Sequence, residues 1–208
     1  MHPNPAYRQE SRDRNLSFAR DRGFGVLSVN GDPAPLISHI PFALSDDGSR
    51  ADIHLVRSNP ISRLATGPLP AVIAVIGPDG YISPDWYGDP AQVPTWNYVA
   101  VHLRGTLHPL PDEALRASLE TLTETFETRL LPKKPWTLDK TPADVQARLM
   151  RMIRPFRFDV AGVDGTWKLA QNKPDHARHS AATHLQGTHI GQETALLAAL
   201  MMGVEDGE

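Results

Sequence analysis

Hydrophobic and polar residues alternate along several short stretches near the start of the chain, a pattern that is typical of half-buried strands. The stretches are FGVLSV (24–29), PLISHIPFAL (35–44) and ADIHLV (51–56). Residues 30–32 (NGD) and 46–48 (DDG) separate them, and both are turn signals. Such short turns leave no room for a crossover helix, so the pattern predicts an antiparallel meander.

Further strands are predicted later in the chain. PAVIAVIG (70–77) is a continuous apolar run, which predicts a central strand that is buried on both faces. NYVAVHLRGTLHPL (97–110) alternates again, and FRFDVAGVDGTWKL (156–169) predicts a final strand pair or one bent strand.

Helices are expected between and after these strands. Apolar residues at 115, 119, 122 and 126 recur at helical spacing and predict an amphipathic helix over 112–130. Asn59-Pro60 and Thr141-Pro142 are start signals for helices over 60–66 and 141–152.

The ends of the chain are also expected to be helical. A polar helix is predicted over 8–21, and two helical pieces follow residue 174, separated near Gly187. Strands joined by hairpin turns, with helices interspersed, predict an α+β protein built on a small antiparallel barrel with peripheral helices. We expect a barrel domain with helical insertions over 1–186 and a helical tail over 187–208.

Composition excludes several classes of site. The chain has 208 residues, a formal net charge of −3, a pI near 6.3 and no cysteine. Disulfides, thiolate metal sites and a cysteine nucleophile are therefore excluded, and no HExxH or similar spacing predicts a metal site. The longest apolar run, 71–76, is too short to span a membrane, and no apolar leader precedes the first helix, so we expect a cytoplasmic protein.

A strand-to-helix junction at VRSNPISRLA (56–65) is a candidate anion site. Helix N-termini present free N–H groups and the positive end of a dipole, and Arg57 and Ser58 lie just before the cap residue Asn59. The alternative is an ordinary capped helix with surface arginines.

Five of the 14 aromatic residues lie in YISPDWYGDPAQVPTWNY (81–98), which is interrupted by prolines. Aromatic walls with a few fixed polar groups are typical of pockets for planar ligands. A loop that packs its rings on the barrel is the alternative. A polar cluster in WKLAQNK (167–173) lies where a predicted strand ends. Strand ends often contact ligands, so the cluster is a candidate for binding. The alternative is a strand end that is simply exposed to solvent.

Three motifs, in order, resemble the PaiB family of FMN-binding negative transcriptional regulators. They are YISPDWY (81–87), VPTWNYVAVHLRG (93–105) and KLAQNK (168–173). The strand SHIPF (38–42) and the turn RSNP (57–60) agree with the same family. The resemblance covers roughly residues 15–180 and implies a split-barrel fold related to pyridoxamine-phosphate-oxidase-like flavoproteins.

The resemblance also implies a cofactor, a partner and a set of site residues. FMN would lie in a cleft at the interface of a homodimer, with its phosphate near Arg57, Ser58 and Asn59. Ser38 and His39 would run past the flavin ring. The pocket wall would be formed, partly by the second subunit, from Ser83, Trp86, Thr95, Trp96 and Asn97, and the site would be closed by Lys168, Gln171, Asn172 and Lys173.

The family's description, negative transcriptional regulator, leaves the biochemical role open. A regulator that senses a small molecule or a redox state is one hypothesis, and a flavin-dependent oxidoreductase on the same fold is the alternative. No residue stands out as a catalytic acid or base. Direct DNA binding is a third hypothesis, but the chain shows neither a helix-turn-helix pattern nor a basic stripe.

Overall fold

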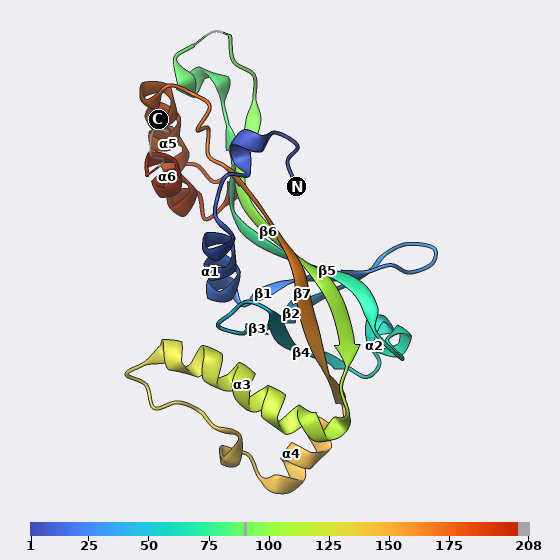
Figure 1. Cartoon of the computed structure of the whole chain (residues 1–208). Helices are drawn as coiled ribbons and strands as arrows, with labels where there is room; N and C mark the ends of the chain where they lie inside the picture. The colour runs from blue at the N-terminus through green and yellow to red at the C-terminus, as the bar shows by residue number, and fades with distance from the viewer. Residues whose placement is uncertain (90, 204–208) are drawn as a thin grey trace. The chain divides into compact units, whose positions relative to one another are not determined.

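The computed structural model of the chain describes residues 1–89 and 91–203 (Figure 1). Its helices and strands are η1 (Pro5–Tyr7), α1 (Arg12–Arg22), β1 (Phe24–Val29), β2 (Leu36–Pro41), β3 (Ala43–Leu44), β4 (Arg50–Val56), α2 (Pro60–Leu64), β5 (Leu69–Ile82), η2 (Pro84–Tyr87), β6 (Thr95–Pro109), η3 (Asp112–Ala114), α3 (Leu115–Glu127), η4 (Thr128–Leu130), η5 (Leu138–Lys140), α4 (Ala143–Met150), β7 (Ile153–Lys168), α5 (Asp175–Gln186), β8 (Gly191–Gln192) and α6 (Thr194–Met202).

The strands form one sheet in the order β2-β1-β5-β6-β7-β4-β3, and β8 is added to β5. The pairs whose register is defined are antiparallel, including β1 with β2 and β4 with β7. The path has two ends, so the sheet is open rather than closed. This arrangement confirms the predicted α+β class.

The chain divides into two compact units. The first unit comprises Met1–Asn15, Ile76–Val101 and Asp164–Glu208, and the second comprises Leu16–Val75 and His102–Val163. The last five residues of the predicted tail over 187–208 lie outside the described residues.

The core of the second unit lies between the strands. Alternate residues of each strand point to the same face, and the inward ones are fully buried, among them Leu27, Ile53, Ile73, Leu103 and Phe158. Phe42, Phe156 and Ile40 are also fully buried. The helix α3 lies alongside β3 and β4 (Figure 1), and Leu115 and Leu122 provide its buried contacts.

The first unit contains a helical pair. Helix α5 packs against α6, and Ala181, Leu185 and Leu197 are fully buried. Arg178, only 2% exposed, pairs with Asp175 at 2.5 Å and donates from Nε to the carbonyl of Met201 at 3.0 Å. The buried guanidinium therefore links the two helices.

Several predicted elements changed in extent. The run 35–44 divides into β2 and β3. Of the two alternatives for 156–169, a strand pair or one bent strand, the structure has a single strand, β7, which begins earlier and has 16 residues. Strand β5 is central, as predicted, but it is not buried on both faces. Val72 and Ala74 are half-buried and Ile76 is 58% exposed, because nothing in the described chain covers that face completely.

Candidate functional site

The residues implied by the resemblance fall into two groups. Those in the second unit are Ser38, His39, Arg57, Ser58 and Asn59. Those in the first unit are Ser83, Trp86, Thr95, Trp96, Asn97, Lys168, Gln171, Asn172 and Lys173. Each group is described within its own unit.

Asn59 organises the group in the second unit. Its side-chain oxygen accepts from the backbone N–H of Ile61 at 2.9 Å and caps α2, as the sequence predicted. Its Nδ2 donates to the hydroxyl of Ser38 on β2 at 3.0 Å. One amide therefore fixes both the start of α2 and a side chain of the neighbouring strand.

Arg57 lies exposed beside this cap. Its guanidinium forms an ion pair with Asp112 at 2.7 Å, and its Nε donates to the carbonyl of Arg151 at 2.9 Å. Both members of the ion pair are solvent-exposed, and exposed pairs contribute little free energy, so a phosphate could replace Asp112 at the guanidinium. Ser58 is exposed as well.

Ser38 and His39 lie on opposite faces of β2, because successive side chains of a strand alternate. Ser38 is half-buried against Asn59, whereas His39 is exposed on the outer face. The two side chains therefore contact different surroundings.

A pocket of about 130 Å³ lies in the first unit, where β6 begins and β7 ends. Five residues of the predicted group line it, namely Thr95, Asn97, Lys168, Asn172 and Lys173. Tyr7, Tyr87, Gln92, Val93 and Ala170 complete the lining. Pockets for drug-sized ligands measure roughly 300–1,000 Å³, so this one suits one polar group of a larger ligand.

Two lysines give the pocket its charge. Lys168 Nζ donates to Thr95 Oγ1 at 2.5 Å and lies 5.9 Å from the centre of the Tyr7 ring. Burial lowers the pKa of Lys168. Lys173 bonds to Gln92 and lies 5.5 Å from the centre of the Tyr87 ring. Ammonium groups held among aromatic faces attract an anion or a carbonyl-rich ligand edge.

The two tyrosines are part of the same apolar wall. Tyr87 is 4% exposed, and burial, with a smaller contribution from Tyr7, raises its pKa to about 12. Burial also raises the pKa of Tyr7. Both phenols therefore stay protonated near neutral pH and are available as hydrogen-bond donors.

Asn97 supplies an unused acceptor. Its side chain is 1% exposed, Nδ2 contacts the sulfur of Met201 at 3.5 Å, and Oδ1 has no hydrogen-bond partner in the described part of the chain. A buried amide oxygen without a donor is costly, and it favours a ligand that presents an N–H or O–H group here.

Gln171 and Ser83, two further predicted residues of the first unit, do not line the pocket. Gln171 accepts from the backbone N–H of Leu169 at 2.8 Å and donates to the carbonyls of Ala6 and Trp167. It thus ties η1 to the turn after β7. Ser83 precedes η2 and makes no side-chain cap bond to it.

The tryptophans of the aromatic segment occupy two environments. Trp86 stacks on His184 of α5, with ring centres 5.8 Å apart and planes 10° apart. Trp96 is 46% exposed and meets Tyr81 edge-on at 6.3 Å. Neither of these two rings lines the pocket: Trp86 packs on the helical pair and Trp96 is part of the exposed surface, whereas Tyr87 of the same segment lines the pocket.

Five residues that line the pocket were not among the predicted site residues, namely Tyr7, Tyr87, Gln92, Val93 and Ala170. Tyr7 lies in η1, which Asn4 caps by accepting from the N–H of Ala6 at 3.0 Å. The Asn-Pro start at residues 4–5 has the same form as the signal at 59–60 and could have revealed this turn. Gln92 carries no comparable local signal.

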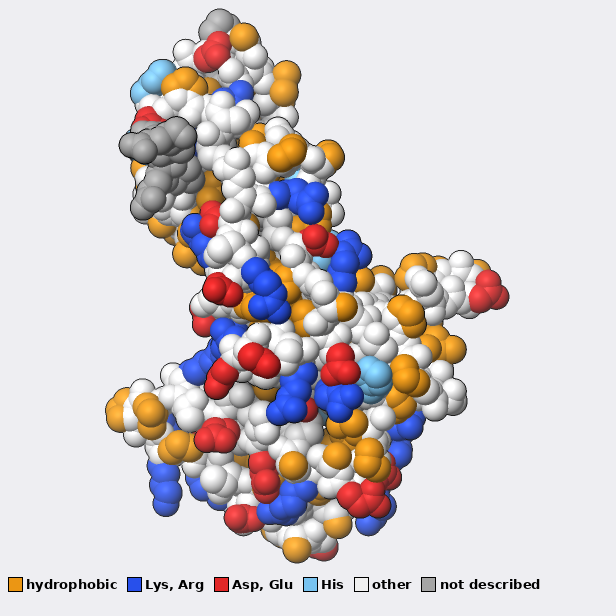
Figure 2. All heavy atoms as spheres, viewed as in Figure 1, with side chains coloured by type: hydrophobic (Ala, Val, Ile, Leu, Met, Phe, Trp, Pro, Cys, Tyr) orange, Lys and Arg blue, Asp and Glu red, His pale blue; other side chains and the backbone are white. Residues whose placement is uncertain are grey.

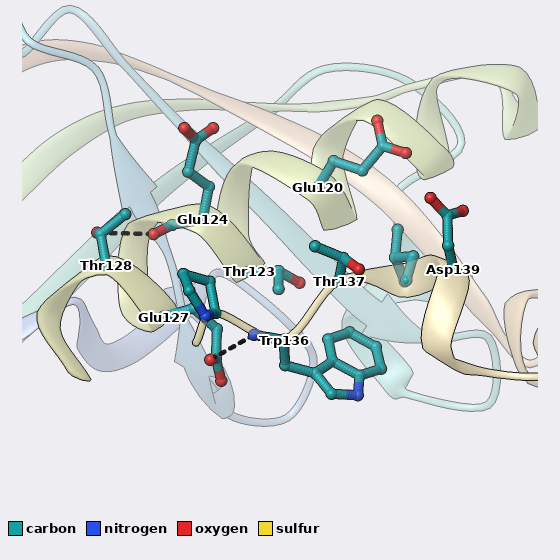
Figure 3. A pocket seen from close by; sticks show the side chains of 10 residues that line it. Glu120, Thr123, Glu124, Glu127, Thr128, Trp136, Thr137 and Asp139 are labelled. Atoms are coloured by element: carbon teal, nitrogen blue, oxygen red, sulfur yellow. Dashed lines mark hydrogen bonds between the residues drawn. The ribbon is translucent and has the colours of Figure 1, made fainter. Parts of the chain in front are cut away.

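A larger groove, of about 380 Å³, lies in the second unit between α3 and residues 135–139 (Figure 3). Its lining includes four carboxylates, those of Glu120, Glu124, Glu127 and Asp139, and the ring of Trp136. The backbone N–H of Trp136 donates to Glu127 at 2.7 Å, as Figure 3 shows. The carboxylates make this groove unsuitable for a phosphate.

Metal and membrane features were searched in residues 1–89 and 91–203. Within these residues no group of three His, Asp or Glu side chains could hold a metal ion. No helix in the same residues is long and apolar enough to cross a membrane.

Sequence comparison identifies relatives of the chain. A family described as "Putative FMN-binding domain" matches residues 1–162. The protease synthase and sporulation protein PAI 2 of Bacillus subtilis is 28% identical over 159 residues, which are 76% of this chain and 75% of that protein. The uncharacterized protein YKL070W of Saccharomyces cerevisiae is 34% identical over 125 residues, which are 56% of this chain and 69% of that protein.

Solved structures agree on the fold. The FAD and heme binding protein of Mycobacterium smegmatis has a TM-score of 0.57 at 19% identity, covering 89% of this chain and 82% of that one. The flavocytochrome Anf3 of Azotobacter vinelandii has a TM-score of 0.54 at 13% identity, covering 80% of this chain and 72% of that one. The predicted family resemblance and the split-barrel fold are confirmed.

Proposed function

Since the chain belongs to the FMN-binding domain family that matches residues 1–162, we propose that it binds FMN and acts as a ligand-responsive negative regulator of transcription. The family match supports FMN, or a related flavin, as the cofactor. When bound, a flavin supplies electron-transfer chemistry, while the protein provides binding, orientation and electrostatics.

The unused acceptor on Asn97 is the observation that carries the flavin proposal. The pocket combines this buried oxygen with the ammonium groups of Lys168 and Lys173. A flavin presents an N–H group between two carbonyls on one edge of its ring, and its tail carries a phosphate. The chemistry of these donors and acceptors therefore fits a flavin group.

The phosphate is assigned to the second unit in this proposal. Arg57 and Ser58 are exposed beside the cap residue Asn59, and the guanidinium is engaged with an exposed carboxylate that a phosphate can displace. The two groups of residues are tested independently because they belong to different units.

The cofactor test is a titration of the purified chain with FMN, followed by visible absorption and by quenching of flavin fluorescence. We expect saturable binding that weakens about tenfold or more in Arg57→Met and in Lys168→Met, since each removes a charge-assisted hydrogen-bond donor. Arg148→Met, an exposed arginine of α4, is the matched control. Absence of saturable binding by the unmodified chain would refute the flavin proposal.

We further propose that the partner is a second copy of this chain. In the second unit, the outer face of β2-β1-β5 carries two cross-strand rows, His39–Val26–Ala74 and Ile37–Ser28–Val72. Ile37 is 62% exposed and Phe24, on the same face of β1, is 54% exposed. Large apolar side chains exposed on one face of a sheet are the surface that a partner could cover.

The assembly is tested by sedimentation velocity. The unmodified chain is expected to sediment as a dimer, and Ile37→Glu is expected to shift it towards the monomer because it buries a charge in the interface. Val56→Glu changes a residue that is 48% exposed on β4 and serves as the control. A monomer at every concentration would overturn the homodimer proposal.

The distribution of charged side chains supports regulation through a ligand, because a surface that contacts DNA broadly would need a continuous basic stripe. On the face seen in Figure 2, Lys and Arg side chains are interspersed with Asp and Glu. Two basic residues are also engaged internally: Lys133 pairs with Glu127, and Arg154 donates to the carbonyls of Ser62 and Ala65.

The role is tested by two measurements. A titration with duplex DNA across salt concentrations is expected to give a log–log slope near zero, and a slope steeper than about −5 would establish direct binding through several phosphates. Stopped-flow mixing of the FMN-bound chain with NADH and NADPH tests the oxidoreductase alternative. Flavin reduction at about 1 s⁻¹ or faster, a rate typical of enzymes, would replace the regulatory proposal.

A further inference from the structure

Another polar cavity, separate from the pocket and the groove described above, lies wholly within the second unit between α3 and the strands β4 and β7. Its volume is about 240 Å³. The strands contribute Arg50, Asp52 and Arg157, and the helix side contributes Ser118 and Thr121. None of the residues implied by the family resemblance belongs to its lining.

The sequence explains why this space is open. The helix presents small side chains to the strands at positions 114, 117, 118 and 121, while Leu115 and Leu122 make the buried contacts. Small residues on that stripe leave a gap, and the long charged side chains of the strands border the gap instead of filling it. Leu110 adds an apolar wall.

Ser118 is the feature that points to a ligand. It is 5% exposed, and its Oγ has no hydrogen-bond partner within the described residues. A buried hydroxyl without a partner is unfavourable, and a molecule that occupies the cavity would satisfy it.

The charges of the lining restrict that molecule. Asp52 is the cross-strand partner of Arg157 in the β4–β7 register. Arg157 uses Nε and Nη2 to bind Asp159, at 2.7 and 3.1 Å, and Nη1 takes part in neither bond. Arg50 follows the same face of β4 as Asp52, and no ion pair of its side chain is found in the described part of the chain.

Asp52 is itself unusual. Burial raises its pKa against the opposing influence of Arg50 and Arg157, so the carboxyl is partly desolvated and a ligand donor would stabilise it. A simple anion would be attracted by the arginines but repelled by this carboxylate. A simple cation would be repelled by the two guanidinium groups. A ligand with an acidic group and an adjacent donor satisfies both.

We propose that this cavity binds a small carboxylic acid that carries an amino or hydroxyl group next to the carboxylate, as α-amino acids and α-hydroxy acids do. The carboxylate pairs with Arg50 and the free side of Arg157, the adjacent donor bonds to Asp52, and Ser118 bonds to the ligand in the interior. The volume is below that of pockets for drug-sized molecules, which restricts the side chain of the ligand to a short one.

The site does not depend on the flavin proposal, and the experiment keeps the two apart. Calorimetric titrations of the full chain, with and without saturating FMN, use L-serine, L-alanine, L-lactate and L-malate as probes. Acetate lacks the adjacent donor, and ethanolamine lacks the carboxylate. We expect saturable binding of at least one of the four probes, with acetate and ethanolamine at least tenfold weaker, whether or not FMN binds. Tighter binding of L-serine or L-alanine would identify the ligand as an amino acid, and tighter binding of L-lactate or L-malate would identify it as a hydroxy acid.

Matched variants assign the binding to this cavity. Arg50→Met is expected to weaken the probe at least tenfold, whereas Arg148→Met is expected to leave it unchanged. Ser118→Ala is expected to weaken it about fivefold without lowering the melting temperature of the ligand-free chain, because it removes a hydroxyl that has no partner. Ser62→Ala, a buried serine of α2 outside the cavity, is the control.

Three results would overturn the proposal. The first is that none of the four probes binds. The second is that acetate or ethanolamine binds as tightly as the probes. The third is equal affinity in the unmodified chain and in both Arg50→Met and Ser118→Ala, which would place the binding elsewhere.

Discussion

Replacing Asn15 tests how the first unit is fixed at the end of β7. The side chain is 4% exposed, and its Oδ1 accepts from Nε1 of the buried Trp167 at 2.8 Å. Its Nδ2 donates to the carbonyls of Glu10 and Ser11, at 3.3 and 3.0 Å. Trp167 directly precedes Lys168, so this contact also places the pocket lysine.

The expected magnitude follows from these bonds. Asn15→Leu removes the acceptor of a buried indole N–H, which costs about 1–3 kcal/mol, and it removes bonds to two carbonyls, which adds about 1 kcal/mol. The free energy of unfolding should therefore fall by about 2–4 kcal/mol. Trp167→Phe should also destabilise, because it leaves the amide oxygen of Asn15 without this donor.

A double-mutant cycle in urea measures the contact. In the double variant both partners are absent, so we expect the combined loss to be smaller than the sum of the single losses by about 1–2 kcal/mol. Arg14→Met is the control for the cation–π contact, since the Arg14 guanidinium lies 4.5 Å above the Trp167 ring and such contacts contribute about 0.5–1 kcal/mol. It also removes the partly exposed ion pair of Arg14 with Glu10, which contributes little. Strict additivity, or a loss below about 0.5 kcal/mol in Asn15→Leu, would refute the reasoning.

Three further predictions concern the second unit. Gly105→Ala should destabilise by about 3 kcal/mol or more in urea, because a Cβ at Gly105 would lie 1.9 Å from the carbonyl oxygen of Asp159. Gly162→Ala should be nearly neutral, because a Cβ there would lie 3.9 Å from Cβ of Arg104, an ordinary contact. Hydrogen bonds from Ser45 and Ser49 lower the pKa of Asp47 from 3.8 to about 2, so its stabilising contribution should be complete above about pH 4 and be lost as the pH falls towards 2. The urea midpoints of the unmodified chain and Asp47→Asn should therefore converge at low pH, and a constant difference between them would contradict this. Asn59→Ala should lose both the cap of α2 and the bond to Ser38, costing about 2 kcal/mol by thermal unfolding, whereas Asn59→Asp keeps the cap and can accept from the Ser38 hydroxyl, so it should be milder.

Local signals in the sequence predicted many elements well. The Asn59-Pro60 start of α2 and the strand 24–29 were read correctly because each depends on neighbouring residues alone. Strand β7 was ambiguous, because the local pattern of 156–169 predicted either a strand pair or one bent strand. The strand stays continuous because it pairs with neighbours on both sides, with β4 over residues 153–159 and with β6, and no local pattern reports such pairing.

The candidate site was predicted in part for the same reason. Thr95, Asn97 and Lys168 belong to motifs and do line one pocket. Gln171 belongs to a motif as well, but its hydrogen bonds stabilise a turn. A motif identifies residues that matter without separating those that can face a ligand from those that shape the backbone, and that distinction depends on tertiary contacts.

The first unit is assembled from three separate segments of the chain, and β5, β6 and β7 each continue from one unit into the other without a linker. Neither unit is therefore encoded by one contiguous part of the gene, and neither can be exchanged for another domain by a single replacement. Diversification of such a chain is confined to insertions between strands. The segment from Asp112 to Met150, which contains α3 and α4, lies between β6 and β7 as one continuous stretch within the second unit and is the part of the gene best suited to such exchange.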